Sequence, residues 1–221
     1  MVSYLVCALA YAVLLIACLT LWRRRLTGSG ITAAVAAEFG WAVVIAVQGR
    51  FSPAIEVLVI PAEYLRDLAW ALVLIRCLSN AGTTGAGRIA QRALSALVVV
   101  VTLWALGSFL PGEPGLLVRE VGRYWLWGGF LLAITGLVLV EQVARNTRAT
   151  QRWSLKYLWL AIGAIYAWDL CLYSVAMLHG SLAAVLWADR GVLNAALAVL
   201  LAISFSRIPE WESAAFLSPR G

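Results

Sequence analysis

The sequence predicts an all-α integral membrane protein, a bundle of seven transmembrane helices. Three observations favour this fold class: 63% of the 221 residues are hydrophobic, the mean hydropathy is +0.89, and only 13% are charged. Soluble domains usually contain about 45–50% apolar residues. The charged residues fall between long apolar runs, which is typical of repeated membrane-spanning helices rather than of amphipathic helices around a soluble core.

Seven apolar segments have the length of a transmembrane helix, which needs about 20 residues to cross the hydrocarbon core. In chain order they are residues 2–22, 31–48, 54–78, 93–110, 116–140, 154–178 and 182–206. The connections are short and carry turn-forming sequences: TGSG after the first segment, SNAGTTGAG after the third and PGEPG after the fourth. The expected organisation is therefore one membrane domain, residues 1–206, followed by a short cytoplasmic tail, residues 207–221.

The first segment is expected to be an uncleaved span. A signal peptide has basic residues before its apolar run, whereas Arg23, Arg24 and Arg25 follow this one. Tryptophans near the predicted span ends fit the membrane interface, where indole rings are favoured. Three others, Trp70, Trp159 and Trp168, lie deeper and are expected to be packing residues.

The distribution of basic residues predicts the orientation of the spans. One set of loops holds twelve of the 17 Lys and Arg residues, namely Arg23, Arg24, Arg25, Arg76, Arg88, Arg92, Arg145, Arg148, Arg152, Lys156, Arg207 and Arg220. The opposite set holds only Arg50, with Arg119 and Arg123 in the first turns of the fifth span. Because basic loops stay in the cytoplasm, the N-terminus is expected outside and the C-terminus inside.

Charged residues within the predicted spans are the main signal of a site. A charge at the middle of a bilayer costs about 2.5–3.5 kcal/mol even on lenient scales, so each one needs a partner or a purpose. The residues concerned are Glu38, Glu56, Glu63, Arg66, Asp67, Arg119, Glu120, Arg123, Asp169, Asp189 and Arg190. Glu63 and Asp67 share one helical face, Arg66 can bridge to Glu63, and a cation from another helix is expected to balance the acids.

Asp169 and Arg190 are predicted to form a buried ion pair. At 1.5 Å per residue, both lie about 10–13 Å below the outer ends of two neighbouring spans that a turn at His179–Ser181 joins. The predicted intramembrane polar cluster comprises Glu63, Arg66, Asp67, Arg123, Asp169, Asp189 and Arg190. Two hypotheses remain open: the cluster only fixes the helix register, or it lines a signal-receiving cavity.

Other kinds of site are disfavoured. The four cysteines, Cys7, Cys18, Cys77 and Cys171, form no CxxC motif and have no cluster of histidine partners, so no metal or cofactor is expected. Cys171 lies about 12 Å along the helix from His179, too far for proton transfer, and His179 fits an ordinary interfacial residue. The only lysine, Lys156, lies at a span end, which excludes a retinal Schiff base. No nucleotide-binding or hydrolase motif is present, and no basic patch interleaved with aromatics suggests nucleic acid.

Two stretches carry a resemblance to a known family. The segment LVEQVARNTRATQRWSLKYLWLAIGAIYAWDLCLYSVAML, followed by LWADRGVLNAALAVLLAISFSRIPEW, resembles the N-terminal membrane region of PrsK-type sensor histidine kinases of the PEP-CTERM/exosortase system. The resemblance covers about residues 137–211, with weaker support from EYLRDLAWALVLIRCL in the third span. It departs after Trp211, where this chain continues as ESAAFLSPRG and the family continues into further spans and then the kinase.

This resemblance implies a membrane-embedded input domain that passes a membrane or periplasmic signal to a cytoplasmic histidine kinase. It also implies the bacterial inner membrane as location. The implied partners are the lipid bilayer, a kinase domain or response regulator and, as an open question, a second copy of the chain. No autophosphorylation is expected, because residues that bind ATP and accept phosphate are absent from this sequence.

Two alternatives stay open beside the sensor: a small polytopic transporter and a stand-alone membrane accessory protein. Intramembrane acids and arginines also mark substrate or proton paths. Against a transporter, no inverted repeat is visible, and Pro61 is the only proline inside a predicted span. A membrane enzyme is disfavoured because no nucleophile and base are paired.

Overall fold

The computed structural model describes residues 2–22, 26, 30–48, 53–80, 92, 95, 96, 99, 114–147 and 149–207. Within these ranges all regular secondary structure is helical, which confirms the all-α class. Six helices are defined: α1 (Val2–Thr20), α3 (Ile31–Val47), α4 (Pro53–Asn80), α6 (Pro114–Asn146), α7 (Ala149–His179) and α8 (Ala184–Arg207).

Four helices are long and apolar enough to cross a membrane, judged by length and composition in the described ranges. They are α1, the segment Trp125–Asn146 of α6, the segment Leu155–His179 of α7, and α8. Helix α3 is apolar but has only 17 residues. The predicted fourth span, residues 93–110, lies outside the described residues apart from three of its positions. The length and apolar composition of these helices indicate a membrane protein.

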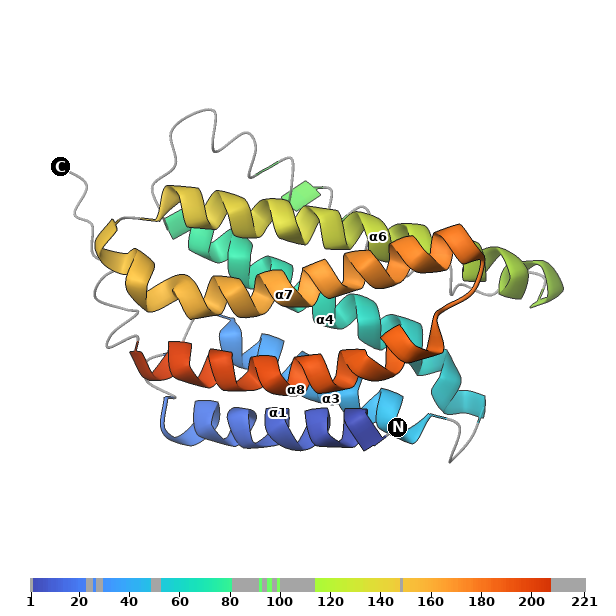
Figure 1. Ribbon diagram of the computed structural model, residues 1–221, viewed down its shortest axis with the longest axis horizontal. Coiled ribbons are helices and arrows are strands. Elements are labelled where there is room, and N and C mark those ends of the chain that lie inside the picture. The colour runs from blue at the N-terminus through green and yellow to red at the C-terminus, as the bar shows by residue number, and fades with distance from the viewer. Residues whose placement is uncertain are drawn as a thin grey trace.

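Local sequence explains several helix ends. Pro53 and Pro114 are the first residues of α4 and α6, where a missing N–H costs no intrahelical hydrogen bond. Gly180 follows the last residue of α7 with φ of +69°, a left-handed conformation that glycine adopts without strain and that commonly ends a helix. Only four residues then separate α7 from α8, so the two helices lie as antiparallel neighbours (Figure 1).

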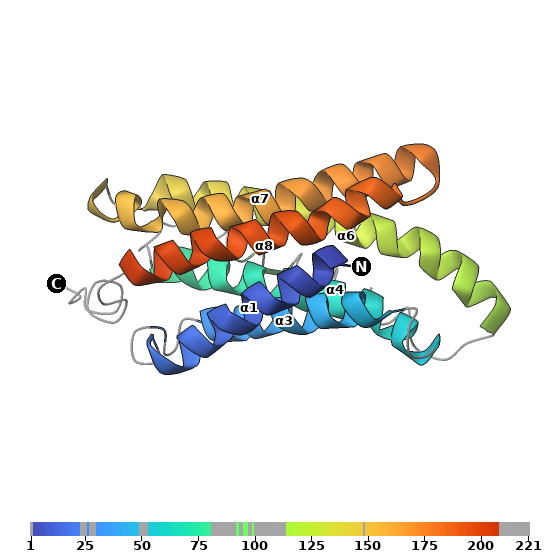
Figure 2. The same ribbon diagram turned by 60° about the horizontal axis from the view of Figure 1, so that its bottom comes forward.

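The six helices pack as a closed ring. Successive neighbours around it are α1, α3, α4, α6, α7 and α8, and α8 closes the ring against α1. Figure 2 shows α1, α3 and α4 on one side of the bundle and α6, α7 and α8 on the other. Helices α1, α4, α6 and α8 run in one direction, whereas α3 and α7 run in the other (Figure 1). The interior of this ring holds the polar residues described below.

Helix α1 shows how the bundle meets its surroundings. Its inward face buries Tyr4 and Tyr11, which are 1% and 0% exposed. Its outward face exposes large apolar side chains, among them Leu9 and Val13, each 68% exposed. A continuous apolar exterior of this kind is costly in water and is the surface expected toward lipid.

Candidate functional site

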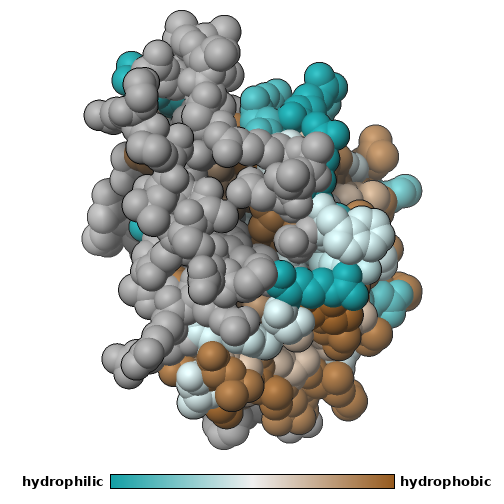
Figure 3. Space-filling model, turned by 90° about the vertical axis from the view of Figure 1, so that its left-hand side faces the viewer, coloured by the Kyte–Doolittle hydropathy of each residue, from teal (hydrophilic) through white to brown (hydrophobic). Residues whose placement is uncertain are grey.

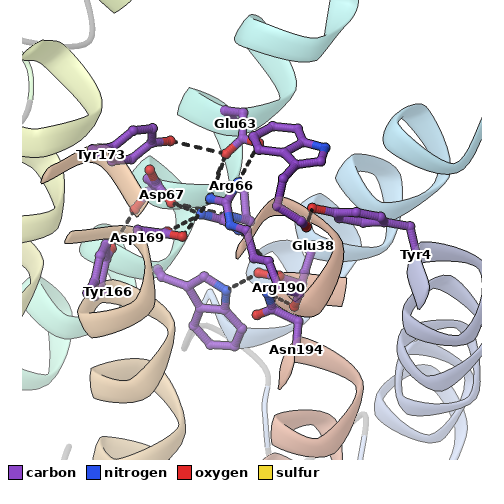
Figure 4. Close-up of polar contacts among 12 residues, drawn as sticks. Tyr4, Glu38, Glu63, Arg66, Asp67, Tyr166, Asp169, Tyr173, Arg190 and Asn194 are labelled. Atoms are coloured by element: carbon purple, nitrogen blue, oxygen red, sulfur yellow. Dashed lines mark hydrogen bonds and ion pairs between the residues drawn. The ribbon is translucent and has the colours of Figure 1, made fainter. Parts of the chain in front are cut away.

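Six charged side chains from four helices meet inside the ring (Figure 4). We call them the buried charge cluster: Glu38 of α3; Glu63, Arg66 and Asp67 of α4; Asp169 of α7; and Arg190 of α8. Each is at most 2% exposed. Because an isolated buried charge is strongly unfavourable, charges held this deeply require partners.

Arg190 joins α8 to two other helices. Its Nη1 donates to Oε1 of Glu63 at 2.7 Å and its Nη2 to Oε2 at 2.8 Å, a two-point pair with α4. Its Nη2 also lies 2.6 Å from Oδ1 of Asp169 on α7. The predicted ion pair between Asp169 and Arg190 is thus confirmed, and Arg190 is the cation from another helix that the acids of α4 require.

Arg66 is the second cation of the cluster. Its Nε and Nη2 donate to Oδ1 of Asp67 at 3.1 and 2.7 Å, and Nη2 also donates to Oδ2 of Asp169. Glu63, one turn earlier in α4, lies 3.7 Å from Nη2. The nearest carboxylate oxygen of Glu38 is 3.9 Å from Nη1, beyond hydrogen-bond distance. Asp169 therefore contacts both guanidinium groups, whereas Glu38 contacts Arg66 only weakly.

Aromatic side chains surround the charges. Both guanidinium groups lie over the ring of Trp41: Cζ of Arg66 is 4.4 Å and Cζ of Arg190 is 4.9 Å from the ring centroid. At these distances each cation interacts with the π face of the indole ring, and this cation–π interaction partly replaces the hydration that the cation loses on burial. The indole N–H of Trp70 donates to Oε2 of Glu38 at 2.7 Å. Trp70 is thus a polar contact of the site rather than only the packing residue that we expected.

Two tyrosines of α7 connect this helix to α4 beside the cluster. Tyr166 donates to the carbonyl oxygen of Asp67 at 2.7 Å, and Tyr173 approaches Oε2 of Glu63 at 3.4 Å. Glycines of α6 leave space for these rings: an added Cβ would lie 2.5 Å from the ring of Tyr166 at Gly136 and 2.6 Å from that of Tyr173 at Gly129. Small residues at helix contacts are typical of close packing in membranes.

The structure brings together five of the seven residues of the predicted cluster: Glu63, Arg66, Asp67, Asp169 and Arg190. Asp189 is exposed and does not belong to the cluster, which corrects its assignment. The reason is helical geometry, because consecutive residues point about 100° apart and Arg190 occupies the inward face. Side chains of the remaining predicted residue and three other intramembrane candidates lie outside the described part: Arg123, Glu56, Arg119 and Glu120.

Glu38 is the member that the predicted cluster lacked. It is one of the charged residues within the predicted spans, but neither its depth nor its spacing links it to the other acids. The feature that could have linked Glu38 to the cluster is Trp41, one turn away on the same helix, because its ring contacts both arginines. The weaker candidates Cys171 and His179 are both exposed.

The composition of the cluster limits its chemistry. Four carboxyl groups face two guanidinium groups, so the fully ionised form has a formal charge of −2. No group of three or more His, Cys, Asp or Glu side chains is placed to hold a metal ion in the part of the chain that the structure describes. The arrangement can lock helices together and can take up protons. Comparison with protein-family models, with curated proteins and with solved structures finds no match to this chain.

Proposed function

We propose that the chain is the membrane-embedded input domain of a sensor histidine kinase of the resembled type, and that its last helix carries the signal. The observation that supports this most is the attachment of Arg190, on α8, to Glu63 of α4 and Asp169 of α7. A change in the cluster would alter the position of α8. The kinase region and the response regulator are the proposed partners, and the bacterial inner membrane is the proposed location.

The proposal includes seven spans with the N-terminus outside. The parallel course of α4 and α6 supports it, because these helices would be the third and fifth spans and must run in the same direction (Figure 1). Exposed arginines also gather where α4, α6 and α8 end and α7 begins, and hydrophilic side chains are visible on that end in Figure 3. They are Arg76, Arg145, Arg152 and Arg207. Such a basic end is expected in the cytoplasm.

Reporter fusions test this topology. A cytoplasm-active reporter placed after Gly221 should be active, and an exterior-active reporter should work only at the N-terminus. Cytoplasmic activity at both ends would contradict the seven-span proposal, because an odd number of spans puts the two termini on opposite sides.

The geometry of α8 suits signal transmission. Arg190 lies six residues, or about 9 Å, from the beginning of the helix at Ala184, and the remaining residues continue for about 25 Å to Arg207. A helix that is fixed near one end and continuous to the other can transmit a small shift or rotation as a rigid body. With such short predicted outer loops, the stimulus would be a lipid, a membrane-soluble molecule, a small solute or a partner protein.

A kinase fusion tests the signalling role. A cytoplasmic histidine-kinase core is fused after Gly221, and autophosphorylation is measured in membrane vesicles. Arg190→Leu, alone and combined with Asp169→Asn, should change the rate several-fold, whereas Arg145→Leu should not, because Arg145 is exposed and pairs with Glu141 of its own helix. Equal rates in all folded fusions would contradict the proposal. The reading frame after Gly221 gives a second check, since a kinase continuing from it favours a sensor and a stop codon counts against one.

A small transporter is the second candidate, and the excess of carboxyl groups over guanidinium groups favours it. Acids inside a membrane bundle commonly mark ion or proton paths. Liposomes that contain the purified chain distinguish the two functions: proton or cation flux that depends on Asp169 would support a transporter. Liposomes that show no proton or cation flux, together with a kinase fusion whose autophosphorylation rate changes with Arg190→Leu, would support the sensor. A stand-alone accessory protein would show neither property.

A further inference from the structure

The charges of the cluster do not balance, and they are buried too deeply for solvent to compensate. Glu38, Glu63, Asp67 and Asp169 face only Arg66 and Arg190, and all six side chains are at most 2% exposed. In such surroundings an unpaired carboxylate costs far more than a neutral carboxylic acid. We propose that Glu38 is a proton-binding site, whose carboxyl group carries a proton in the folded protein at neutral pH.

Glu38 is the acid with the weakest cation contacts. Glu63 accepts two hydrogen bonds from Arg190, and Asp67 accepts two from Arg66. Asp169 contacts both arginines. Among the described residues, Glu38 has one cation within 4.0 Å, at 3.9 Å, and its one side-chain hydrogen bond comes from the uncharged indole of Trp70. A neutral donor stabilises a carboxylate less than a guanidinium group does.

One oxygen of Glu38 is free for the proton. Its Oε2 accepts the hydrogen bond from Trp70, whereas Oε1 is buried and has no hydrogen-bond partner among the residues that the structure describes. A fully buried acceptor without a partner is unfavourable as a charged atom. A proton on Oε1 removes the charge and leaves the hydrogen bond to Oε2 in place.

Every helix packed around this site contributes groups that influence the proton. Titratable and charged side chains face the interior from α1, α4, α7 and α8: Tyr4, Cys7, Tyr11, Glu63, Arg66, Asp67, Tyr166, Asp169, Tyr173 and Arg190. The two cations in this set are already engaged by Glu63, Asp67 and Asp169. No unengaged cation therefore remains for Glu38 within the described part of the bundle.

The proton on Glu38 also affects which carboxyl groups Arg66 contacts. If Glu38 lost it, a new negative charge would lie 3.9 Å from Nη1 of Arg66, which has no hydrogen-bond partner in the described ranges. Arg66 would then be drawn away from Asp67 and Asp169 toward α3. Proton binding at Glu38 thus selects between two pairings of Arg66, and this holds whether the domain serves as a sensor or as a transporter.

Infrared spectroscopy tests the protonation state directly. The full chain in lipid nanodiscs at neutral pH should show the C=O stretch of a protonated carboxylic acid, and Glu38→Gln should remove one such band. Glu141→Gln is the matched control, because Glu141 is exposed and paired within α6; it should leave the band unchanged. Identical protonated-carboxyl spectra for wild type and Glu38→Gln would overturn the proposal.

Stability provides an independent readout. Glutamine has the shape of a protonated glutamate, so Glu38→Gln should unfold at the same temperature as wild type or higher at neutral pH. Wild type should lose stability relative to Glu38→Gln as the pH rises above about 4.3, because the unfolded glutamate ionises there while the folded one keeps its proton. A Glu38→Gln protein that is less stable than wild type at neutral pH, with a difference that shrinks in acid, would show an ionised, paired Glu38.

Discussion

Arg190 of α8 and Glu63 of α4, which are 127 residues apart in sequence, form a two-point ion pair between their helices. Nη1 donates to Oε1 at 2.7 Å and Nη2 donates to Oε2 at 2.8 Å, and neither side chain is more than 1% exposed. The planar fork of arginine matches a carboxylate in a way that an ammonium group cannot. The pair therefore fixes both the distance and the orientation of α8 relative to α4.

Arg190→Lys should destabilise the domain although it keeps the positive charge. Lysine supplies a point charge and loses the two-point geometry, so we expect a loss of about 1.5–3 kcal/mol in the free energy of unfolding, the usual size of a hydrogen bond to a charged group. Unfolding in mixed micelles measures it. Arg145→Lys, at an exposed pair within α6, should change stability by less than about 1 kcal/mol. An equal effect at both positions would contradict this interpretation.

Arg190→Leu should cost more alone than in combination with Asp169→Asn. Alone, it removes one of the two cations and increases the excess of negative charge inside the bundle, a change that typically costs about 3–5 kcal/mol, whereas Asp169→Asn removes an ion-pair partner of both guanidinium groups. The double variant removes one charge of each sign and should recover much of that loss. A double-variant cycle on the free energy of unfolding provides the test, and purely additive losses would show that the two residues do not act as a pair.

Gly136→Ala should weaken the contact between α6 and α7. The added methyl group would lie 2.5 Å from three atoms of the Tyr166 ring, so the ring or the helix must move, at a cost of about 1–3 kcal/mol. Gly40→Ala is the matched control because nothing lies within 4 Å of its added Cβ. That change should be neutral or stabilise α3 by up to about 1 kcal/mol. If both variants melt at the same temperature, the proposed contact is unimportant.

The hydroxyl group of Tyr166 should contribute to stability, whereas that of Tyr11 should not. Tyr166 donates to the carbonyl oxygen of Asp67 at 2.7 Å, so Tyr166→Phe should cost about 0.5–1.5 kcal/mol. Tyr11 is equally buried, but its hydroxyl oxygen has no hydrogen-bond partner among the described residues. Tyr11→Phe should therefore be neutral or slightly stabilising. Thermal unfolding of the two variants side by side measures the difference, and equal losses would contradict the assigned hydrogen bond.

The common level of Asp169 and Arg190 along the bundle was predictable from the sequence. The regular rise of a helix placed Asp169 and Arg190 at one level, and the spacing of Glu63, Arg66 and Asp67 placed them on one face. The rotation of α8 was predicted only in part: the acid Asp169 favoured Arg190 as its partner, but the predicted cluster also included the adjacent Asp189, which is exposed. The second partner of Arg190, Glu63, lies 127 residues away in sequence, and no spacing along the chain indicates that contact.

The position of Glu38 was hidden for a related reason. A single acid on an apolar helix carries no periodic signal that identifies which neighbouring helix it faces. Its link to the cluster runs through Trp70 and Trp41, and a tryptophan inside an apolar span is usually only a packing residue. Nothing in the sequence indicates that the glycines of α6 are packing contacts, because this role depends on which tyrosine rings lie opposite them. Contacts between helices therefore had to come from the three-dimensional arrangement.

The buried charge cluster sets the position of α8, and the distance between α6 and α8, measured with and without the Asp169–Arg190 pair, is a decisive test of this role. Spin labels at the exposed residues Arg145 of α6 and Ser206 of α8 are introduced into a chain without other cysteines, and double electron–electron resonance gives their distance distribution in lipid. The folded double variant Asp169→Asn/Arg190→Leu should show a shifted or broadened distribution relative to wild type, because α8 is no longer tied to α4 and α7. An unchanged distribution in that folded variant would contradict the claim.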